Sequence, residues 1–98
     1  MTGPPDRARP TVLVGSKPVI AYVVAALMEL ANGGEVSIEA RGGAISRAVD
    51  TVQVIRTKYL SGSLKIRKIE FDSEPYPAPN GEQSGRFVSS IRIVLSSK

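Results

Sequence analysis

Apolar residues in this chain switch twice from the period of a strand to that of a helix, and each switch falls at a glycine-containing turn. The turns are Gly15-Ser16-Lys17-Pro18 and Arg41-Gly42-Gly43. Alternating apolar and polar residues indicate a half-buried strand, whereas apolar residues three and four positions apart indicate one face of a helix. The expected elements in chain order are a strand over Thr11–Val14, a helix from about Pro18 to Ala31, a strand over Glu35–Arg41, a helix over about Ala44–Leu60, and strands over Leu64–Asp72 and Arg86–Leu95.

This β-α-β-α-β-β order predicts an α+β fold, a two-layer α/β sandwich with a mixed four-stranded sheet. Successive β-α-β units are right-handed, so both helices are expected on one face of the sheet. Apolar residues change phase between Ile66 and Ile69, and a β-bulge at Arg67-Lys68 would keep both on the core face. The connection Ser73–Gly85 contains three prolines and is expected to form an extended hairpin arm between the last two strands.

Composition narrows the function classes. The 98 residues include 13 Lys and Arg against 9 Asp and Glu, a formal net charge of +4 that favours polyanionic partners. The chain has no cysteine and no histidine, which excludes a disulfide framework, most zinc sites and histidine-based triads. No apolar run is long enough for a membrane span, and no signal sequence is evident at the start. We expect an intracellular protein with a flexible tail over 1–10 and one domain over 11–98.

Both turns have the properties of a phosphate-binding site. A strand-to-helix junction leaves backbone N–H groups of the first helical turn without intrahelical partners, at the positive end of the helix dipole. Glycine lets an anion approach the backbone closely, and Lys17 and Arg41 add positive charge. Ser16 is the expected N-cap of the first helix. Because both helices follow parallel strands, the two turns should lie at the same edge of the sheet and form one site.

Several functions remain open at this point. The phosphate-loop motif and the dinucleotide fingerprint are both absent, and the carboxylates fall on expected solvated faces, so a nucleotide enzyme is a weak alternative. A protein-interaction domain that uses the apolar first helix is another. Few aromatic residues are present, which favours duplex or structured nucleic acid over single strands. Neither a cofactor nor a metal is expected.

Two segments carry a family resemblance. Gly15-Ser16-Lys17-Pro18 and the stretch Arg41–Thr51, together with the element order, resemble the Alba family of archaeal chromatin proteins over about Val12–Leu95. The resemblance implies a non-enzymatic domain that coats and compacts double-stranded DNA without sequence preference. It also implies a homodimer in the cytoplasm, associated with the nucleoid. Structured RNA, a ribonuclease P-type particle, a paralogous heterodimer partner and dimer–dimer arrays are the alternative assemblies, and no membrane partner is expected.

The resemblance also implies site residues. The expected DNA-binding residues are Ser16, Lys17, Arg41, Gly42, Gly43, Arg47, Gln83, Ser84 and Arg86. The expected contacts between subunits or between neighbouring dimers are Tyr22, Arg56, Tyr59 and Leu60. Many family members have two lysines in the first turn, the first of them subject to acetylation, and an arginine in the second turn. Here Ser16 and Gly43 occupy those two positions, and each removes a positive charge.

Overall fold

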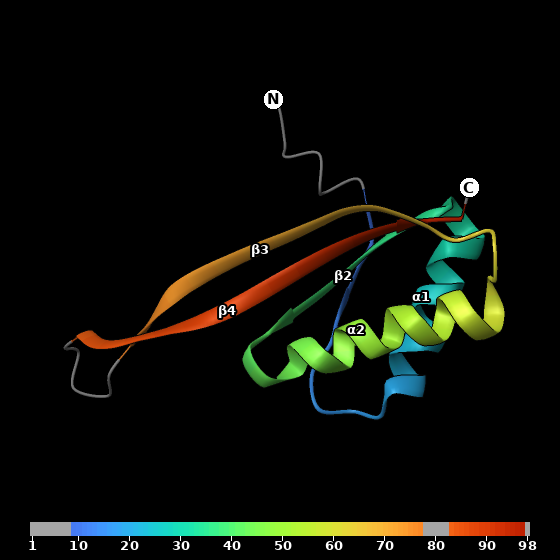
Figure 1. The fold of residues 1–98 in the computed structure, drawn as a ribbon. Helices are drawn as coiled ribbons and strands as arrows, with labels where there is room; N and C mark the ends of the chain where they lie inside the picture. The colour runs from blue at the N-terminus through green and yellow to red at the C-terminus, as the bar shows by residue number, and fades with distance from the viewer. Residues whose placement is uncertain (1–8, 78–82, 98) are drawn as a thin grey trace.

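The computed structural model describes residues 9–77 and 83–97 (Figure 1). Its elements in chain order are β1 (Thr11–Leu13), α1 (Val19–Gly33), β2 (Glu35–Arg41), the 3-10 helix η2 (Gly42–Ala44), α2 (Ile45–Val54), the π-helix η3 (Ile55–Tyr59), β3 (Lys65–Pro77) and β4 (Gln83–Ser96). The predicted α+β fold is therefore confirmed.

The four strands form one mixed sheet in the order β1-β2-β4-β3. β1 is parallel to β2, and β4 runs antiparallel to both β2 and β3. Both helices cover the same face of this sheet (Figure 1). β3 and β4 continue to pair after β2 has ended opposite Ser90, and they form a two-stranded arm that extends past the helices. The tip of the expected arm, residues 78–82, lies outside the described residues.

The core lies between the helices and the sheet. Alternate residues of the two central strands point into it, among them Val36 and Ile38 of β2 and Leu95 of β4, all fully buried. Val23 and Ala26 of α1 meet them from the helix side. Full burial of one such branched aliphatic side chain contributes roughly 1.5–3 kcal/mol. The apolar periods that predicted the elements therefore also define the core.

The sequence predicted the C-terminal end of α1 correctly but not its N-terminal end. The C-terminal end follows the prediction, because Gly34 has φ +83° and donates its N–H to the carbonyl oxygen of Leu30. At the other end the N-cap is Pro18, without a side-chain hydrogen bond, so the expectation that Ser16 caps the helix is wrong. The turn before Pro18 is held instead by hydrogen bonds to the hydroxyl of Tyr22.

The second helical segment is continuous but changes its winding. It begins as the 3-10 helix η2, continues as α2 and ends as the π-helix η3, so the predicted span of about Ala44–Leu60 is confirmed in extent. The hydroxyl of the fully buried Thr51 donates to the carbonyl oxygen of Arg47 at 2.8 Å, which satisfies the one polar group on the buried face.

The predicted bulge in β3 is confirmed by the strand register. Ile66 pairs with Leu95 and Lys68 with Val94, so Arg67 is the extra residue. Its Nε donates to Ser96 Oγ at 3.2 Å. Ile69 then lies opposite Ile93. The bulge therefore keeps Ile66, Ile69 and Phe71 on the helix side of the sheet.

Charged side chains cover the opposite face of the sheet. Arg92 of β4 lies between two carboxylates from its neighbouring strands, with its Nε 3.0 Å from Glu39 and its Nη1 3.4 Å from Glu70. Near the start of the described chain, Arg9 pairs with Glu35 at 3.2 Å and the Pro10 carbonyl accepts from the backbone N–H of Ser37. Within the described residues, no helix has both the length and the apolar character needed to cross a membrane.

Candidate nucleic-acid interface

The first glycine-containing turn, residues 15–17, is exposed but conformationally fixed. The hydroxyl oxygen of Tyr22 accepts two hydrogen bonds from it, one from the N–H of Gly15 and one from the N–H of Lys17, both at 2.9 Å. These two N–H groups precede the first turn of α1 and are bonded within the chain, so they are not free to bind a phosphate. The side chain of Lys17 is exposed. The turn thus offers a cation on a fixed backbone.

The second turn depends on a glycine for its backbone. Gly42 has φ +55°, in the left-handed region that favours glycine. The 3-10 helix that starts there has no side-chain cap, and Arg41 precedes it in an extended conformation. Gly43 needs no such conformation, and a Cβ built on it would meet nothing within 4 Å. Gly43 is therefore open to an approaching phosphate, whereas Gly42 lies against the side chain of Val88.

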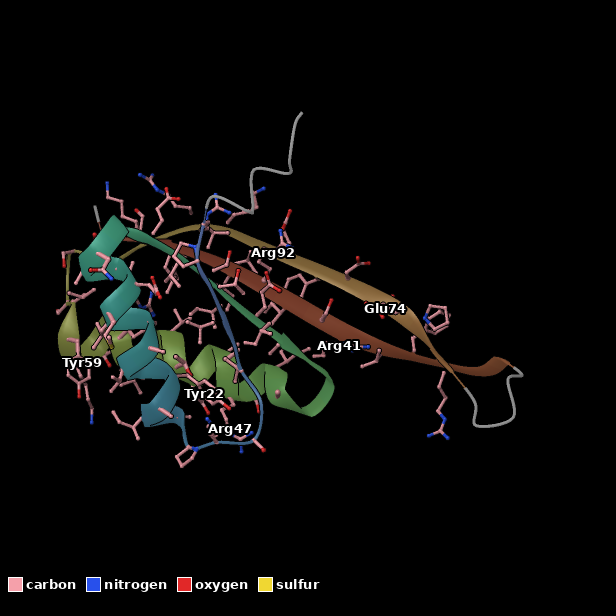
Figure 2. The ribbon with its side chains drawn as sticks, turned by 180° about the vertical axis from the view of Figure 1, so that it is seen from behind. Tyr22, Arg41, Arg47, Tyr59, Glu74 and Arg92 are labelled. Carbon is pink, nitrogen blue, oxygen red and sulfur yellow. The ribbon has the colours of Figure 1, made fainter. Side chains whose placement is uncertain are left out.

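The structure brings the two turns together, as the sequence predicted. Arg47, in the first turn of α2, donates from Nη1 to the carbonyl oxygen of Gly15 at 2.9 Å. Arg47 and Tyr22 lie at the same end of the molecule, where β1 leads into α1 (Figure 2). This contact uses one of the five N–H donors of the guanidinium group. The two turns therefore form a single surface with Lys17 and Arg41 on it.

Arg41 marks the border of this surface. Its Nη2 lies 3.3 Å from Glu74 of the arm, and both side chains are largely exposed (Figure 2). An exposed ion pair of this kind contributes about 1 kcal/mol or less, so a phosphate can compete for Arg41. Next to it lies a cavity of about 690 Å³ at the ends of β1 and β2. The charged residues lining the cavity are Glu39, Arg41, Glu70, Asp72, Glu74 and Arg92. This excess of carboxylates disfavours a polyanion on the outer face of the sheet.

An apolar groove opens between α2 and the edge strand β3. It has a volume of about 340 Å³, and apart from Gln53 and Arg56 all its lining residues are aliphatic or aromatic. Phe71 is 75% exposed and Ile69 is 49% exposed, and Val49 and Ile66 are partly exposed beside them. Two helices are too narrow to cover a four-stranded sheet, so the outermost strand keeps its apolar face open. Exposed apolar surface of this kind marks an interaction site.

The family profile for Alba matches residues 10–73, which include both turns and the start of the arm. This chain belongs to the Alba family. Alba from Thermoplasma volcanium has a similar structure, with a TM-score of 0.75 and 36% sequence identity over 88% of this chain and 98% of that one. The structure of ALBA1 from Trypanosoma brucei gives a TM-score of 0.70 and 26% identity over 91% of this chain and 69% of that one.

Membership of the Alba family identifies the general function. Alba proteins are in general nucleic-acid-binding architectural proteins without enzymatic activity. The choice between DNA and RNA depends on features finer than the fold.

The remaining residues implied by the resemblance to Alba lie in three places. Gln83, Ser84 and the exposed Arg86 belong to the arm in β4. Arg56 lines the apolar groove, Tyr59 is half exposed at the end of η3 and Leu60 packs against the core. Tyr22 is 8% exposed, because its ring is in the core of its own subunit and its hydroxyl holds the first turn. It therefore has little surface to offer a second subunit.

Two features of this Alba protein were missed by sequence reasoning. The alternation of the groove residues Ile66, Ile69 and Phe71 is that of a buried strand face and predicts that they lie in the core. Only the strand order, with β3 at the edge, reveals that they are partly exposed. The pairing of Arg41 with Glu74 joins residues 33 positions apart, and no local pattern signals it.

Proposed function

We propose that this chain is a sequence-independent architectural protein that binds, coats and compacts double-stranded DNA as a homodimer. The observation that carries the proposal is the junction of the two turns, joined by the contact between Arg47 and Gly15. In the proposed complex Lys17, Arg41 and Arg47 neutralise phosphates. The backbone at Gly42 and at the open Gly43 donates N–H groups to them. The arm with Gln83, Ser84 and Arg86 follows a groove of the duplex.

The exposed faces of the helices favour binding without base reading. A helix that reads sequence presents polar side chains to the base edges in the major groove. Here the exposed face of α1 carries Ile20, Val24 and Met28, and α2 packs on the sheet. Contacts are therefore expected with the phosphate backbone, which supplies affinity but no direct sequence information.

The apolar groove supports a homodimer, with a second copy of the same chain as its occupant. A two-fold contact uses the same surface on both partners, so an apolar groove can bury its counterpart. The partly exposed Ile69 and Phe71 would lose their contact with water in such a dimer. Among the described residues, the groove is lined by one cation, Arg56, and by no carboxylate, so its lining does not favour a charged partner. A dimer also doubles the number of phosphate contacts.

Fluorescence anisotropy with labelled nucleic acids tests the proposed function. We expect equal affinity for two unrelated duplexes of the same length. The logarithm of the binding constant should fall linearly with the logarithm of salt concentration, by about 0.9 for each phosphate neutralised. A folded RNA of equal length is the competitor. Displacement of the duplex by this RNA at equal salt would identify structured RNA as the preferred partner. Binding that does not depend on salt would refute a surface that binds phosphates.

An arginine at position 43 is expected to strengthen binding. The position is open, its φ is not in the left-handed region, and the added guanidinium would stand beside Arg41. We expect Gly43→Arg to raise duplex affinity by about three- to tenfold and to steepen the salt dependence by about one unit per subunit. Gly33→Arg is the matched control, since Gly33 is equally open but lies at the far end of α1. Equal gains from both variants would mean that net charge, not position, controls affinity.

A further inference from the structure

The hydroxyl of Tyr22 has an unusual position for the side chain of a core residue. The ring is buried in the core, yet its oxygen reaches the surface and meets the exposed turn of residues 15–17. A hydroxyl oxygen has two acceptor lone pairs, and here the N–H groups of Gly15 and Lys17 both point at it. One side chain therefore fixes the backbone on both sides of Ser16.

Arg47 fixes the same turn from the other direction. Its Nη1 donates to the carbonyl oxygen of Gly15, so Gly15 is bonded through its N–H to Tyr22 and through its carbonyl to Arg47. Figure 2 shows the two side chains converging from α1 and α2 on this end of the molecule. The two bonds tie the turn to both helices. The turn therefore cannot move without breaking one of them.

We infer that Tyr22 and Arg47 are positioning residues that hold Lys17 in place for contact with a phosphate. The inference rests on the proposed function and adds a cause for it. A lysine on a mobile loop loses backbone and side-chain freedom when it binds, and this loss of conformational entropy weakens binding. In this chain the backbone is fixed before binding. Ser16 stands where many family members have a lysine, so the turn carries one positive charge less. The contribution of Lys17 therefore depends more heavily on a backbone that is fixed before binding.

Tyr22→Phe tests the inference, because it keeps the ring and removes the oxygen. We expect amide hydrogen exchange at Gly15 and Lys17 to become at least about tenfold faster, while exchange in the core of α1 stays the same. Duplex affinity should fall by about three- to tenfold. Arg47→Met, which keeps the apolar stem and removes the donor, should also speed exchange at Lys17. Thr57→Val is the control, since it removes a hydroxyl bonded to Gln53 away from the turn.

A double-mutant cycle separates positioning from general structural damage. If Tyr22 acts through Lys17, then Tyr22→Phe should weaken duplex binding in the wild-type background and have no further effect in Lys17→Ala. Additive losses, unchanged amide exchange or tighter binding by Tyr22→Phe would overturn the inference. Failure of Lys17→Ala itself to weaken binding would instead overturn the proposed function. Thermal unfolding of each variant shows whether the fold is intact, and the exchange rates do not require any nucleic acid.

Discussion

Ile69→Glu is expected to convert the proposed homodimer into a folded monomer. Ile69 is 49% exposed in the apolar groove, so a carboxylate there stays in contact with water in the single subunit and would lose that water among apolar side chains in the dimer. The change removes up to roughly 1.5–3 kcal/mol of apolar burial from each subunit and adds the desolvation of a charge. The dimer dissociation constant should rise at least about a hundredfold. Sedimentation velocity at micromolar concentration measures it.

Met28→Glu is the matched control for this change. Met28 is 61% exposed on the apolar face of α1, away from the groove, and the substitution adds the same charge. We expect it to leave the dimer intact. Dissociation by Met28→Glu with an intact dimer in Ile69→Glu would place the subunit interface on α1 instead. The monomeric variant should also bind duplex DNA at least about tenfold more weakly, because each particle then carries half of the phosphate contacts.

Lys17→Ala is expected to weaken duplex binding more than any other single substitution on the surface formed by the two turns. Its side chain is exposed on a fixed turn, and no ion pair of Lys17 is found within the described residues. A phosphate contact of about 1–1.4 kcal/mol in each subunit gives a loss of roughly tenfold per lysine, or about a hundredfold for a dimer. The salt dependence should become shallower by about one unit for each lysine removed.

The pattern of this loss across sequences is as informative as its size. Lys17→Ala should weaken binding by the same factor on unrelated duplexes, since a phosphate contact carries no base information. Lys58→Ala is the control, because Lys58 is an exposed cation in η3, away from the two turns. A loss restricted to one sequence, or an equal loss from both variants, would contradict the assigned role of Lys17.

Local signals predicted most of the fold and the position of the two turns. The glycines at 33 and 34 ended α1 as expected, and the change of phase between Ile66 and Ile69 revealed the bulge. Both predictions rest on residues close together in the chain, where the residue types directly determine the backbone conformation and the face that each side chain takes. The adjacency of the turns also followed, because right-handed connections leave little choice of topology.

Hydrogen bonds between side chains of the two helices and the backbone of the first turn account for what the sequence did not reveal. Tyr22 is five and seven positions from its two backbone donors, and its ring has the spacing of an ordinary core residue. Arg47 was expected to bind phosphate, and its bond to Gly15 spans 32 positions. The contact of Arg47 depends on how α1 and α2 pack at one end of the sheet. That packing has no local pattern of its own.

The bulge in β3 also determines where this chain can change length. Arg67 is the residue without a partner in β4, so a deletion at 67 or 68 would leave a regular ladder with Ile66 and Ile69 still on the same face. Deletion of Glu70 would instead make Ile69 and Phe71 neighbours in sequence, and one of them would turn to the charged face of the sheet. Insertions and deletions in related chains should therefore cluster at the bulge and be absent from the residues that follow it.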